Sequence, residues 1–282
     1  MLAAGCLWGT IGLFVKLLNN AGSSSGYTTF LRMSFAFLLL LVITLAKDGI
    51  RAFKIDRGTL ISCMLLGFIS MSLNNLLYTA AVNTLGMSLA AALLYSAPIF
   101  TSIESRIIFA EKIGGRKILA IAVCAVGCVL SATGGDFSSV NLSWIGIAFG
   151  LGAALAYSTQ NIFGKMATGG ASPFVVSTYQ FLFATVFTVI AGKPFSTVAN
   201  PLDGTMLLYG FLLALIPTTI AYLLYFSGVQ GIEEASKVPV MAAMELVVAT
   251  ILGIIVFHEA FTLGSIAGVV LILASIVVMS KE

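Results

Sequence analysis

The stretch LWGTIGLFVK at residues 7–16 recurs in altered form as AYSTQNIFGK at residues 156–165. The aligned pairs are Trp8 with Tyr157, Phe14 with Phe163, and Lys16 with Lys165. Similarity between two parts of one chain at a fixed offset is typical of architectures built from repeats. We therefore expect this chain to consist of two related halves.

Two further pairs of stretches are separated by nearly the same number of residues. They are LYTAAVNTLGMSLA (77–90) with LYFSGVQGIEEASK (224–237), and FAEKI (109–113) with FHEAF (257–261). The offset stays between 147 and 149 residues throughout. The alignment pairs Tyr78 with Tyr225 and Glu111 with Glu259. It predicts that the repeat extends over the whole chain and not only over its first helices.

The composition is that of a membrane protein. Of the 282 residues, 59% are hydrophobic and 9% are charged, whereas a soluble domain has about 25% charged residues. Apolar runs recur along the whole chain, which excludes a soluble globule and a receptor with a single anchor. The formal charge of +3 is small and dispersed, so we expect no binding to nucleic acid.

Dividing the chain at its charges and polar gaps, with about 20 residues for each membrane helix, gives ten spans. They are predicted near 2–18, 28–46, 58–80, 87–108, 116–133, 143–164, 173–191, 204–226, 235–256 and 262–279. The connections between them are too short to hold a soluble domain. No basic residue precedes the first span, so we expect that no signal peptide is removed.

The basic residues predict the orientation. The loops after the second and fourth spans hold Lys47, Arg51, Lys54, Arg57, Lys112, Arg116 and Lys117. The loops after the third, fifth and ninth spans hold no Lys or Arg. Because basic loops stay on the cytoplasmic side, we expect both termini to be cytoplasmic.

Each repeat holds five spans, and an odd number reverses the direction in which the second copy enters the membrane. We expect two inverted halves, residues 1–134 and residues 135–282. Inverted repeats are typical of secondary transporters, because two similar halves of opposite orientation can open a central site to either side.

The chain also resembles a known family, the EamA-type family of the drug/metabolite transporter superfamily, in its ten-helix form. The resemblance depends on LWGTIGLFVK, on Arg32 followed by an apolar run, and on FAEK repeated within MELVVATILGIIVFHE (244–259). Pro98 occupies the usual position of a family proline, whereas Leu246 replaces it in the second copy. The resemblance implies an all-helical bundle around a central cavity lined by spans 1, 3, 4, 6, 8 and 9, with spans 5 and 10 behind.

Glu245 is the principal candidate for a functional residue. It is about the eleventh residue of the ninth span, and an ionised carboxylate near the bilayer centre costs several kcal/mol unless it is paired or hydrated. It could bind a cationic or zwitterionic substrate, or carry a proton that couples transport to a gradient. A purely structural hydrogen-bonded acid is the alternative.

Other residues on the expected cavity-lining spans are weaker candidates. The aromatic ones are Trp8, Tyr95, Tyr157 and Tyr222, and the amides are Asn74, Asn75, Gln160 and Asn161. Aromatic rings offer apolar surface and a face for cations, whereas helix packing and hydrogen bonds between helices are the competing roles. Tyr78 and Tyr225 are candidate outer and inner gates, with interfacial belt residues as the alternative.

The remaining charges have structural explanations. Arg32 lies near the outer end of its span, so we expect its side chain to reach the headgroups, with pairing to an acid or an anionic substrate as the alternative. Lys16 and Lys165 suit helix C-termini, and Glu111 and Glu259 suit the N-termini of the following helices. Glu104 and Arg106 could form an inner gate. Three G-x-x-x-G pairs predict close helix packing inside the bundle; they are Gly5/Gly9, Gly146/Gly150 and Gly264/Gly268.

Enzymatic chemistry finds no support. GSSSG (22–26) matches a serine-hydrolase pattern, but it lies in a short turn with no preceding strand, and His258 is in another loop. The chain has no H-E-x-x-H and no Walker A motif. Four cysteines lie in apolar stretches, and Cys124 and Cys128 have no nearby His or acid for a metal site.

We therefore expect a secondary transporter, without metal or cofactor, that exports a small organic metabolite such as an amino acid or an amine by alternating access. Coupling to protons is part of this hypothesis. An importer or facilitator of a small organic cation is the alternative, and a scaffold or receptor without transport is a remote one. The expected setting is a bacterial or archaeal plasma membrane, with the protein a monomer or a homodimer.

Overall fold

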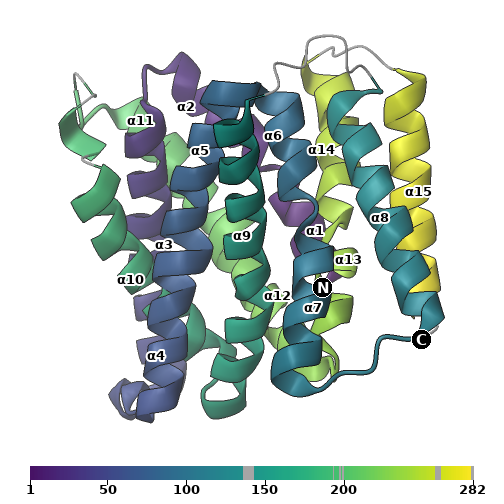
Figure 1. Ribbon diagram of the computed structural model, residues 1–282. Helices are drawn as coiled ribbons and strands as arrows, with labels where there is room; N and C mark the ends of the chain where they lie inside the picture. The colour runs from purple at the N-terminus through teal and green to yellow at the C-terminus, as the bar shows by residue number, and fades with distance from the viewer. Residues whose placement is uncertain (136–142, 193, 197, 199, 258–261, 281–282) are drawn as a thin grey trace.

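The computed structural model describes residues 1–135, 143–192, 194–196, 198, 200–257 and 262–280, and these residues form helices and loops without strands. The first half contains α1 (Leu2–Trp8), α2 (Ile11–Asn20), α3 (Ser25–Asp48), α4 (Arg57–Leu65), α5 (Asn74–Leu85), α6 (Met87–Leu94), α7 (Ala97–Phe109) and α8 (Gly115–Thr133). The second half contains α9 (Trp144–Gly170), α10 (Pro173–Gly192), α11 (Gly204–Ala214), α12 (Ala221–Gly231), α13 (Val238–Ala242), α14 (Met244–Phe257) and α15 (Leu263–Ser280). The helices stand side by side in one bundle (Figure 1).

Eight helical stretches among the described residues are long and apolar enough to cross a membrane. They are Leu2–Asn20, Ser25–Asp48, Arg57–Leu85, Gly115–Thr133, Pro173–Ala191, Gly204–Gly231, Ala235–Val256 and Leu263–Ser280. The other two predicted spans correspond to the helix pair α6 and α7 and to the long helix α9. The predicted all-helical membrane fold is confirmed, and the chain is an integral membrane protein.

Short polar side chains begin several of these helices. Each accepts a hydrogen bond from a backbone N–H of the first turn, which has no partner inside the helix. The capping residues are Ser24 before α3, Asp56 before α4, Ser143 before α9 and Asp203 before α11. The sequence therefore marks where a helix begins even in an apolar chain.

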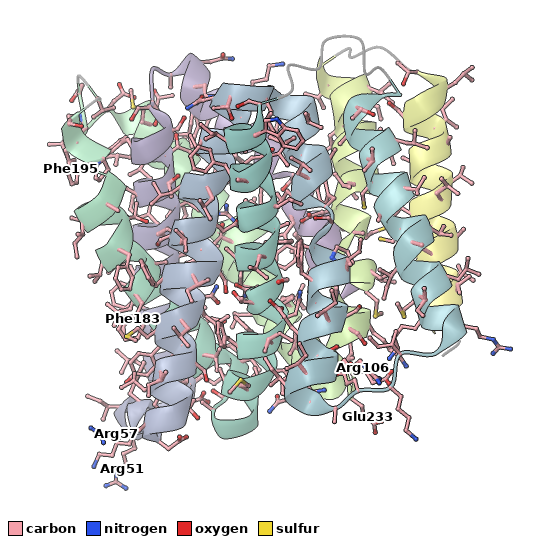
Figure 2. The ribbon with its side chains drawn as sticks, viewed as in Figure 1. Arg51, Arg57, Arg106, Phe183, Phe195 and Glu233 are labelled. Atoms are coloured by element: carbon pink, nitrogen blue, oxygen red, sulfur yellow. The ribbon has the colours of Figure 1, made fainter. Side chains whose placement is uncertain are left out.

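The charged loops gather at one end of the bundle. Arg51, Arg57, Arg106 and Glu233 all lie at this end, whereas Phe195 lies near the opposite one (Figure 2). The last helix, α15, also ends at the charged end (Figure 1). One end therefore carries the basic loops, as the sequence predicts, and the assignment of this end to the cytoplasm stays a prediction.

Several spans are interrupted near their middle. The helix breaks at Gly9–Thr10 in the first span, at Tyr95–Ser96 in the fourth and at Ala243 in the ninth. Two π-helical segments, Leu66–Leu73 and Leu215–Ile220, interrupt the third and eighth spans. The π segments begin 149 positions apart, and Tyr95 and Ala243 are 148 positions apart, which matches the offset of the sequence repeat. The two halves thus share these irregularities, whereas the break at Gly9–Thr10 has no counterpart in the continuous helix α9.

Glycines allow the closest helix contacts. A Cβ atom on Gly9 would lie 2.6 Å from the backbone oxygen of Glu245, and one on Gly5 would lie 2.9 Å from that of Ala242. A Cβ on Gly150 would meet Leu93 at 2.5 Å, and one on Gly264 would meet the backbone of Gly134. The prediction that these pairs pack inside the bundle is confirmed. The first pair brings α1 against α13 and α14.

The helices α8 and α15, the last of each half, pair with one another at one edge of the bundle (Figure 1). A Cβ on Gly127 would lie 2.9 Å from the backbone oxygen of Gly268. The remaining helices surround a core that includes Trp8, Phe181, Tyr222 and Tyr225. This core brings the interrupted spans together.

Candidate functional site

A small pocket lies where the interruptions of the fourth and ninth spans meet. Its lining residues are Tyr95, Ala97, Pro98, Cys128, Tyr157, Pro239, Ala242, Ala243 and Glu245. Its cavity volume is only about 10 Å³, far below the roughly 300–1,000 Å³ of ordinary ligand sites. Cys128 belongs to α8, the fifth span, so this span also contributes to the lining and does not lie wholly behind it.

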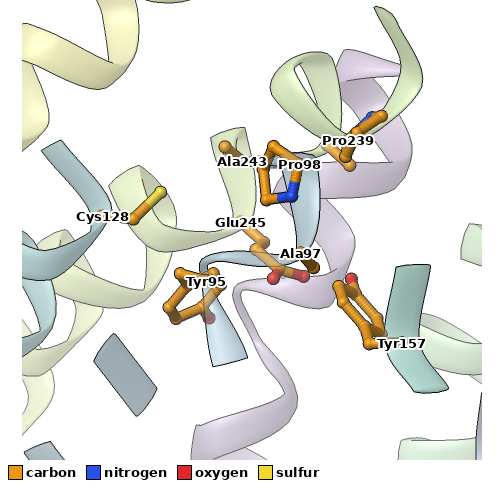
Figure 3. Close-up of a pocket in the computed structure, with 9 residues that line it drawn as sticks. Tyr95, Ala97, Pro98, Cys128, Tyr157, Pro239, Ala243 and Glu245 are labelled. Carbon is orange, nitrogen blue, oxygen red and sulfur yellow. The ribbon is translucent and has the colours of Figure 1, made fainter. Parts of the chain in front are cut away.

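Glu245 lies at the centre of the pocket. It occupies the first turn of α14, directly after the break at Ala243, where the helix N-terminus favours a negative charge. Its carboxylate lies between the rings of Tyr95 and Tyr157 (Figure 3). The sequence predicts this interior position, because an acid in the middle of a long apolar span lies far from both ends of its helix.

Arg32 also belongs to this region. Its Nε atom donates a hydrogen bond of 3.0 Å to the Thr218 hydroxyl in the π segment of the eighth span. Its guanidinium is attracted electrostatically by the Glu245 carboxylate. The prediction that Arg32 reaches the headgroups is wrong, because its long side chain extends from α3 into the bundle instead of along it.

The π segment prepares Thr218 for this contact. Its hydroxyl donates a hydrogen bond of 2.8 Å to the carbonyl of Leu213, five residues earlier, and so leaves its oxygen free to accept from Arg32. π-helical turns are often found at functional positions. Sequence analysis missed Thr218, since a threonine in an apolar helix carries no visible signal of its role.

An aromatic cluster adjoins the charged residues. The ring of Trp8 lies 5.1 Å from that of Tyr222 and 5.2 Å from that of Tyr225. The hydroxyl of Tyr222 contacts the Met71 sulfur at 3.3 Å. The indole Nε1 of Trp8 is buried, and no described residue accepts its hydrogen. The cluster therefore has apolar surface together with one unused donor.

The amides predicted as candidates have different surroundings. Asn161 donates to the Thr101 hydroxyl at 3.0 Å and accepts from the Tyr225 hydroxyl at 2.9 Å. Gln160 accepts from Gln180 of α10, also at 3.0 Å. Asn161 thus connects α7, α9 and α12 next to the aromatic cluster, whereas Gln160 joins α9 to α10.

Two further amides lie on α5. Asn75 donates to the backbone of Met71 at 2.7 Å, and the Oδ1 atom of Asn74 is buried without a partner among the described residues. The structure does not bring Asn75 to the pocket lining.

Comparison with known proteins decides the family. A model of the EamA-like transporter family matches residues 1–133 and 144–281. The chain belongs to the EamA-like transporter family. This match confirms the resemblance and shows that the protein is a membrane transporter.

Relatives of this transporter cover almost its full length. A protein of Archaeoglobus fulgidus, named an uncharacterized transporter, is 26% identical over 98% of this chain and 93% of its own. The inner membrane transporter YicL of Salmonella typhimurium, also named as uncharacterized, is 23% identical over 100% of this chain and 94% of its own. A solved crystal structure superposes with a TM-score of 0.83 at 15% identity, covering 99% of this chain and 94% of the other. That likeness shows the fold.

The two predicted gate residues of the transporter lie in different places. Tyr225 is buried in the aromatic cluster and bonded to Asn161, so it is not an interfacial belt residue. Tyr78 lies on α5 and is half-buried. Ring contacts in the described part of the chain do not join the two, and their gating roles stay predictions.

Charged residues of both halves meet at the end of the transporter that carries the basic loops. The Glu111 carboxylate accepts hydrogen bonds from the backbone N–H of Ala235 at 2.6 Å and from the Ser236 hydroxyl at 2.7 Å. It also pairs with Lys165 at 3.4 Å, and Lys165 donates to the Glu233 carbonyl. The prediction that the Glu111 carboxylate serves the N-terminus of the next helix is wrong, because it binds Ala235 and Ser236 at the start of the ninth span and not the fifth.

Lys117 completes this interface between the halves. It is 1% exposed and pairs with Glu234 at 3.0 Å, and Glu234 also pairs with Lys237 at 2.9 Å. Burial alone would raise the pKa of Glu234, but hydrogen bonds and charge from both lysines lower it below the ordinary value. We call Glu111, Lys117, Lys165, Glu234 and Ser236 the inter-half cluster. Glu259 and His258 lie outside the described residues.

Glu104 is a second acid within the helices. Its Oε1 atom accepts a hydrogen bond of 2.8 Å from the Ser158 hydroxyl, and its Oε2 atom is buried without a partner among the described residues. The ion pairs of the described part do not include one between Glu104 and Arg106. Arg106 lies exposed at the charged end (Figure 2). The structure thus gives no support to the predicted gate between them.

Proposed function

We propose that this protein is a secondary transporter that exports a small organic metabolite, such as an amino acid or an amine, by alternating access. The observation that carries the proposal is the Glu245 carboxylate in a pocket formed by two interrupted helices. Discontinuous membrane helices typically form the substrate and ion sites of secondary transporters, near the middle of the bilayer. Glu245 is the group that would carry a coupling proton.

The paired interruptions supply a route for conformational change. The π segments and the breaks of the fourth and ninth spans occur at matching positions of both halves, and such positions can absorb backbone rotation during closure. The inter-half cluster would hold one end of the bundle closed while the other opens. In this proposal the cluster end faces the cytoplasm, both termini lie there, and the membrane is a bacterial or archaeal plasma membrane.

Flux into proteoliposomes tests this function. Purified protein is reconstituted, and the movement of labelled amino acids, amines and nucleosides is measured with and without a pH gradient. We expect at least one small charged metabolite to move, and its flux to respond to the gradient. A protein that moves none of these solutes under any gradient would be a scaffold or receptor and not a transporter.

Replacing Glu245→Gln tests proton coupling. The amide keeps the shape of the side chain but cannot exchange a proton, so we expect flux to fall at least tenfold and to lose its dependence on pH. Glu233→Gln is the matched control, because Glu233 is exposed at the charged end, far from the pocket. An E245Q protein with unchanged pH dependence would eliminate the coupling role.

The alternative function is an importer or facilitator of a small organic cation, favoured by the aromatic rings around Glu245. Tyr95 and Tyr157 flank the carboxylate, and such rings attract cations. Vesicles of known orientation distinguish the exporter from the importer. An exporter driven by protons accumulates substrate in inverted vesicles that are acidic inside. Uptake of quaternary amines alone, into right-side-out vesicles, would favour the alternative.

A further inference from the structure

The ninth span starts at the charged end with a short helical element of its own. This element consists of a 3-10 turn (Ala235–Lys237) and α13 (Val238–Ala242), and it ends at the break at Ala243. At the break, the Leu246 N–H donates to the Ala243 carbonyl, three residues earlier instead of the four of an α-helix. Regular helix bonding is therefore interrupted between α13 and α14, the helix that carries Glu245.

Bonds from the first half of the chain hold the start of this element. The Glu111 carboxylate accepts from the backbone N–H of Ala235 at 2.6 Å, and from the backbone N–H and the hydroxyl of Ser236 at 3.3 Å and 2.7 Å. Lys117, at the start of α8, pairs with Glu234 at 3.0 Å. The start of the ninth span is thus attached to the first half by charged groups.

The rest of the element makes apolar contacts. The sequence of α13 is VPVMA, in which no side chain ionises or donates a hydrogen bond. Pro239 and Ala242 of α13 form part of the pocket lining. Apolar contacts are non-directional, so α13 can shift against its neighbours once the bonds at its start are broken. Such a shift would open the pocket toward the charged end.

Charged groups suit an attachment that opens and closes. Lys117 is 1% exposed, and its separation from Glu234 in a dry interior would leave an uncompensated buried charge. When α13 moves away, water reaches the separated groups and hydrates them. The charges are then satisfied by one another in the closed state and by water in the open state.

This attachment belongs to one end of the molecule. In the repeat alignment, EASK (234–237) corresponds to MSLA (87–90) at the start of α6. The first-half copy therefore has no charged side chain where the second half has Glu234 and Lys237. The charged attachment is a property of the ninth span and not a feature common to both repeats.

We propose that residues 235–242 form the gate of the transporter at its charged end, hinged at Ala243 and locked shut by the inter-half cluster. This gate rests on the proposed transport function and deepens it, because it identifies the part of the bundle that moves. When the lock opens, Pro239 and Ala242 withdraw from the pocket lining. Glu245, on the other side of the hinge, then becomes accessible from the charged end.

The native Cys128 thiol tests the gate. It is fully buried and lines the pocket, so a membrane-impermeant thiol reagent reaches it only through an opening of the bundle. Cys6, Cys63 and Cys124 are replaced by alanine, and the rate of Cys128 modification is measured in intact cells and in inverted vesicles. An Arg51→Cys marker in cysteine-free protein shows which preparation presents the charged end, where Arg51 lies (Figure 2).

Two variants weaken the lock. Lys117→Gln removes the partner of Glu234 across the halves, and we expect Cys128 to react about tenfold faster from the charged end. Ser236→Ala removes one bond to Glu111 with little change in volume, and we expect about threefold. Arg116→Gln is the matched control with an unchanged rate, because Arg116 precedes Lys117 on α8 and is exposed. A rate in S236A that stays unchanged, or that rises equally from both sides, would overturn the gate, whether or not K117Q folds.

The outcomes separate the gate from the transport function, because labelling needs neither substrate nor gradient. Faster labelling from the charged end in both lock variants, with no flux of any solute in the wild type, would refute transport and keep the gate. Flux in the wild type, with unchanged labelling in both variants, would keep transport and refute the gate.

Discussion

Glu111 lies in the first half of the chain, yet its carboxylate holds the start of a helical segment in the second half. Burial acts to raise its pKa, but hydrogen bonds from Ser236 and Ala235 and the charge of Lys165 hold the pKa below the ordinary value of a glutamate. A carboxylate with a lowered pKa stabilises the fold above its unfolded-state pKa of about 4.3. That contribution is lost as the pH falls through the lowered pKa.

We predict that Glu111→Gln lowers the free energy of unfolding by about 2 kcal/mol at pH 7, because it weakens charge-assisted bonds to buried donors. The difference from the wild type should shrink as the pH falls below about 4. Thermal unfolding of the purified protein in detergent at pH 7 and at lower pH measures both. Glu233→Gln should show no such change, and a difference that stayed constant with pH would contradict the prediction.

Glu245 and Arg32, the two charged residues of the candidate site, show how far the sequence could predict the position of a single side chain. Glu245 was placed correctly because an acid in the middle of an apolar run must lie deep in the bundle. Arg32 was misplaced because distance along one helix says nothing about the direction in which a long side chain points. Only the packing of α3 against the eighth span, through Thr218, decides that direction.

At the scale of elements, the contact between α1 and α14 positions Glu245. The backbone oxygen of Glu245 lies where a Cβ on Gly9 would meet it at 2.6 Å, and Val248 lies equally close. Both contacts are to atoms that cannot move aside easily, since one is backbone and the other is a Cβ. The position of α14, and therefore of the Glu245 carboxylate, depends on this glycine.

We predict that Gly9→Ala destabilises the protein by about 1–3 kcal/mol through overpacking and lowers flux by displacing Glu245. Gly12→Ala is the matched control, because a Cβ there meets nothing within 4 Å and alanine favours a helix. Thermal unfolding and proteoliposome flux of the two variants give the comparison. Equal stability and flux in both would mean that the α1 contact has no such role.

The spans themselves were predictable, but their interruptions were not. Apolar length fixes where a helix can cross the membrane, and the repeat fixed how many to expect in each half. The breaks at Gly9–Thr10, Tyr95–Ser96 and Ala243 contain no proline themselves, although Pro98 follows the second in the first turn of α7. Pro217 lies inside the second π segment, where a proline removes a helix hydrogen bond, whereas the first π segment contains no proline.

For the whole molecule, the distribution of charge predicts which end faces the cytoplasm. Arg51 is exposed at the end that gathers the basic loops, and Phe195 is exposed near the other end (Figure 2). Basic loops remain on the cytoplasmic side of the membrane in most proteins. The two positions therefore serve as reporters of orientation.

We predict that Arg51→Cys reacts with a membrane-impermeant thiol reagent only from the cytoplasmic side, and Phe195→Cys only from the outside. The background is a variant in which Cys6, Cys63, Cys124 and Cys128 are replaced by alanine or serine, because all four thiols are free. Labelling of intact cells and of inverted vesicles gives the measurement. Reaction of both cysteines from one side would refute the predicted topology.

The seam between α8 and α15 has a consequence for the separate halves. Each half ends in a helix whose glycine face packs against the last helix of the other half, with the backbones of Gly127 and Gly268 in close approach. Neither half alone could bury that face. Separately expressed halves should therefore associate along this seam.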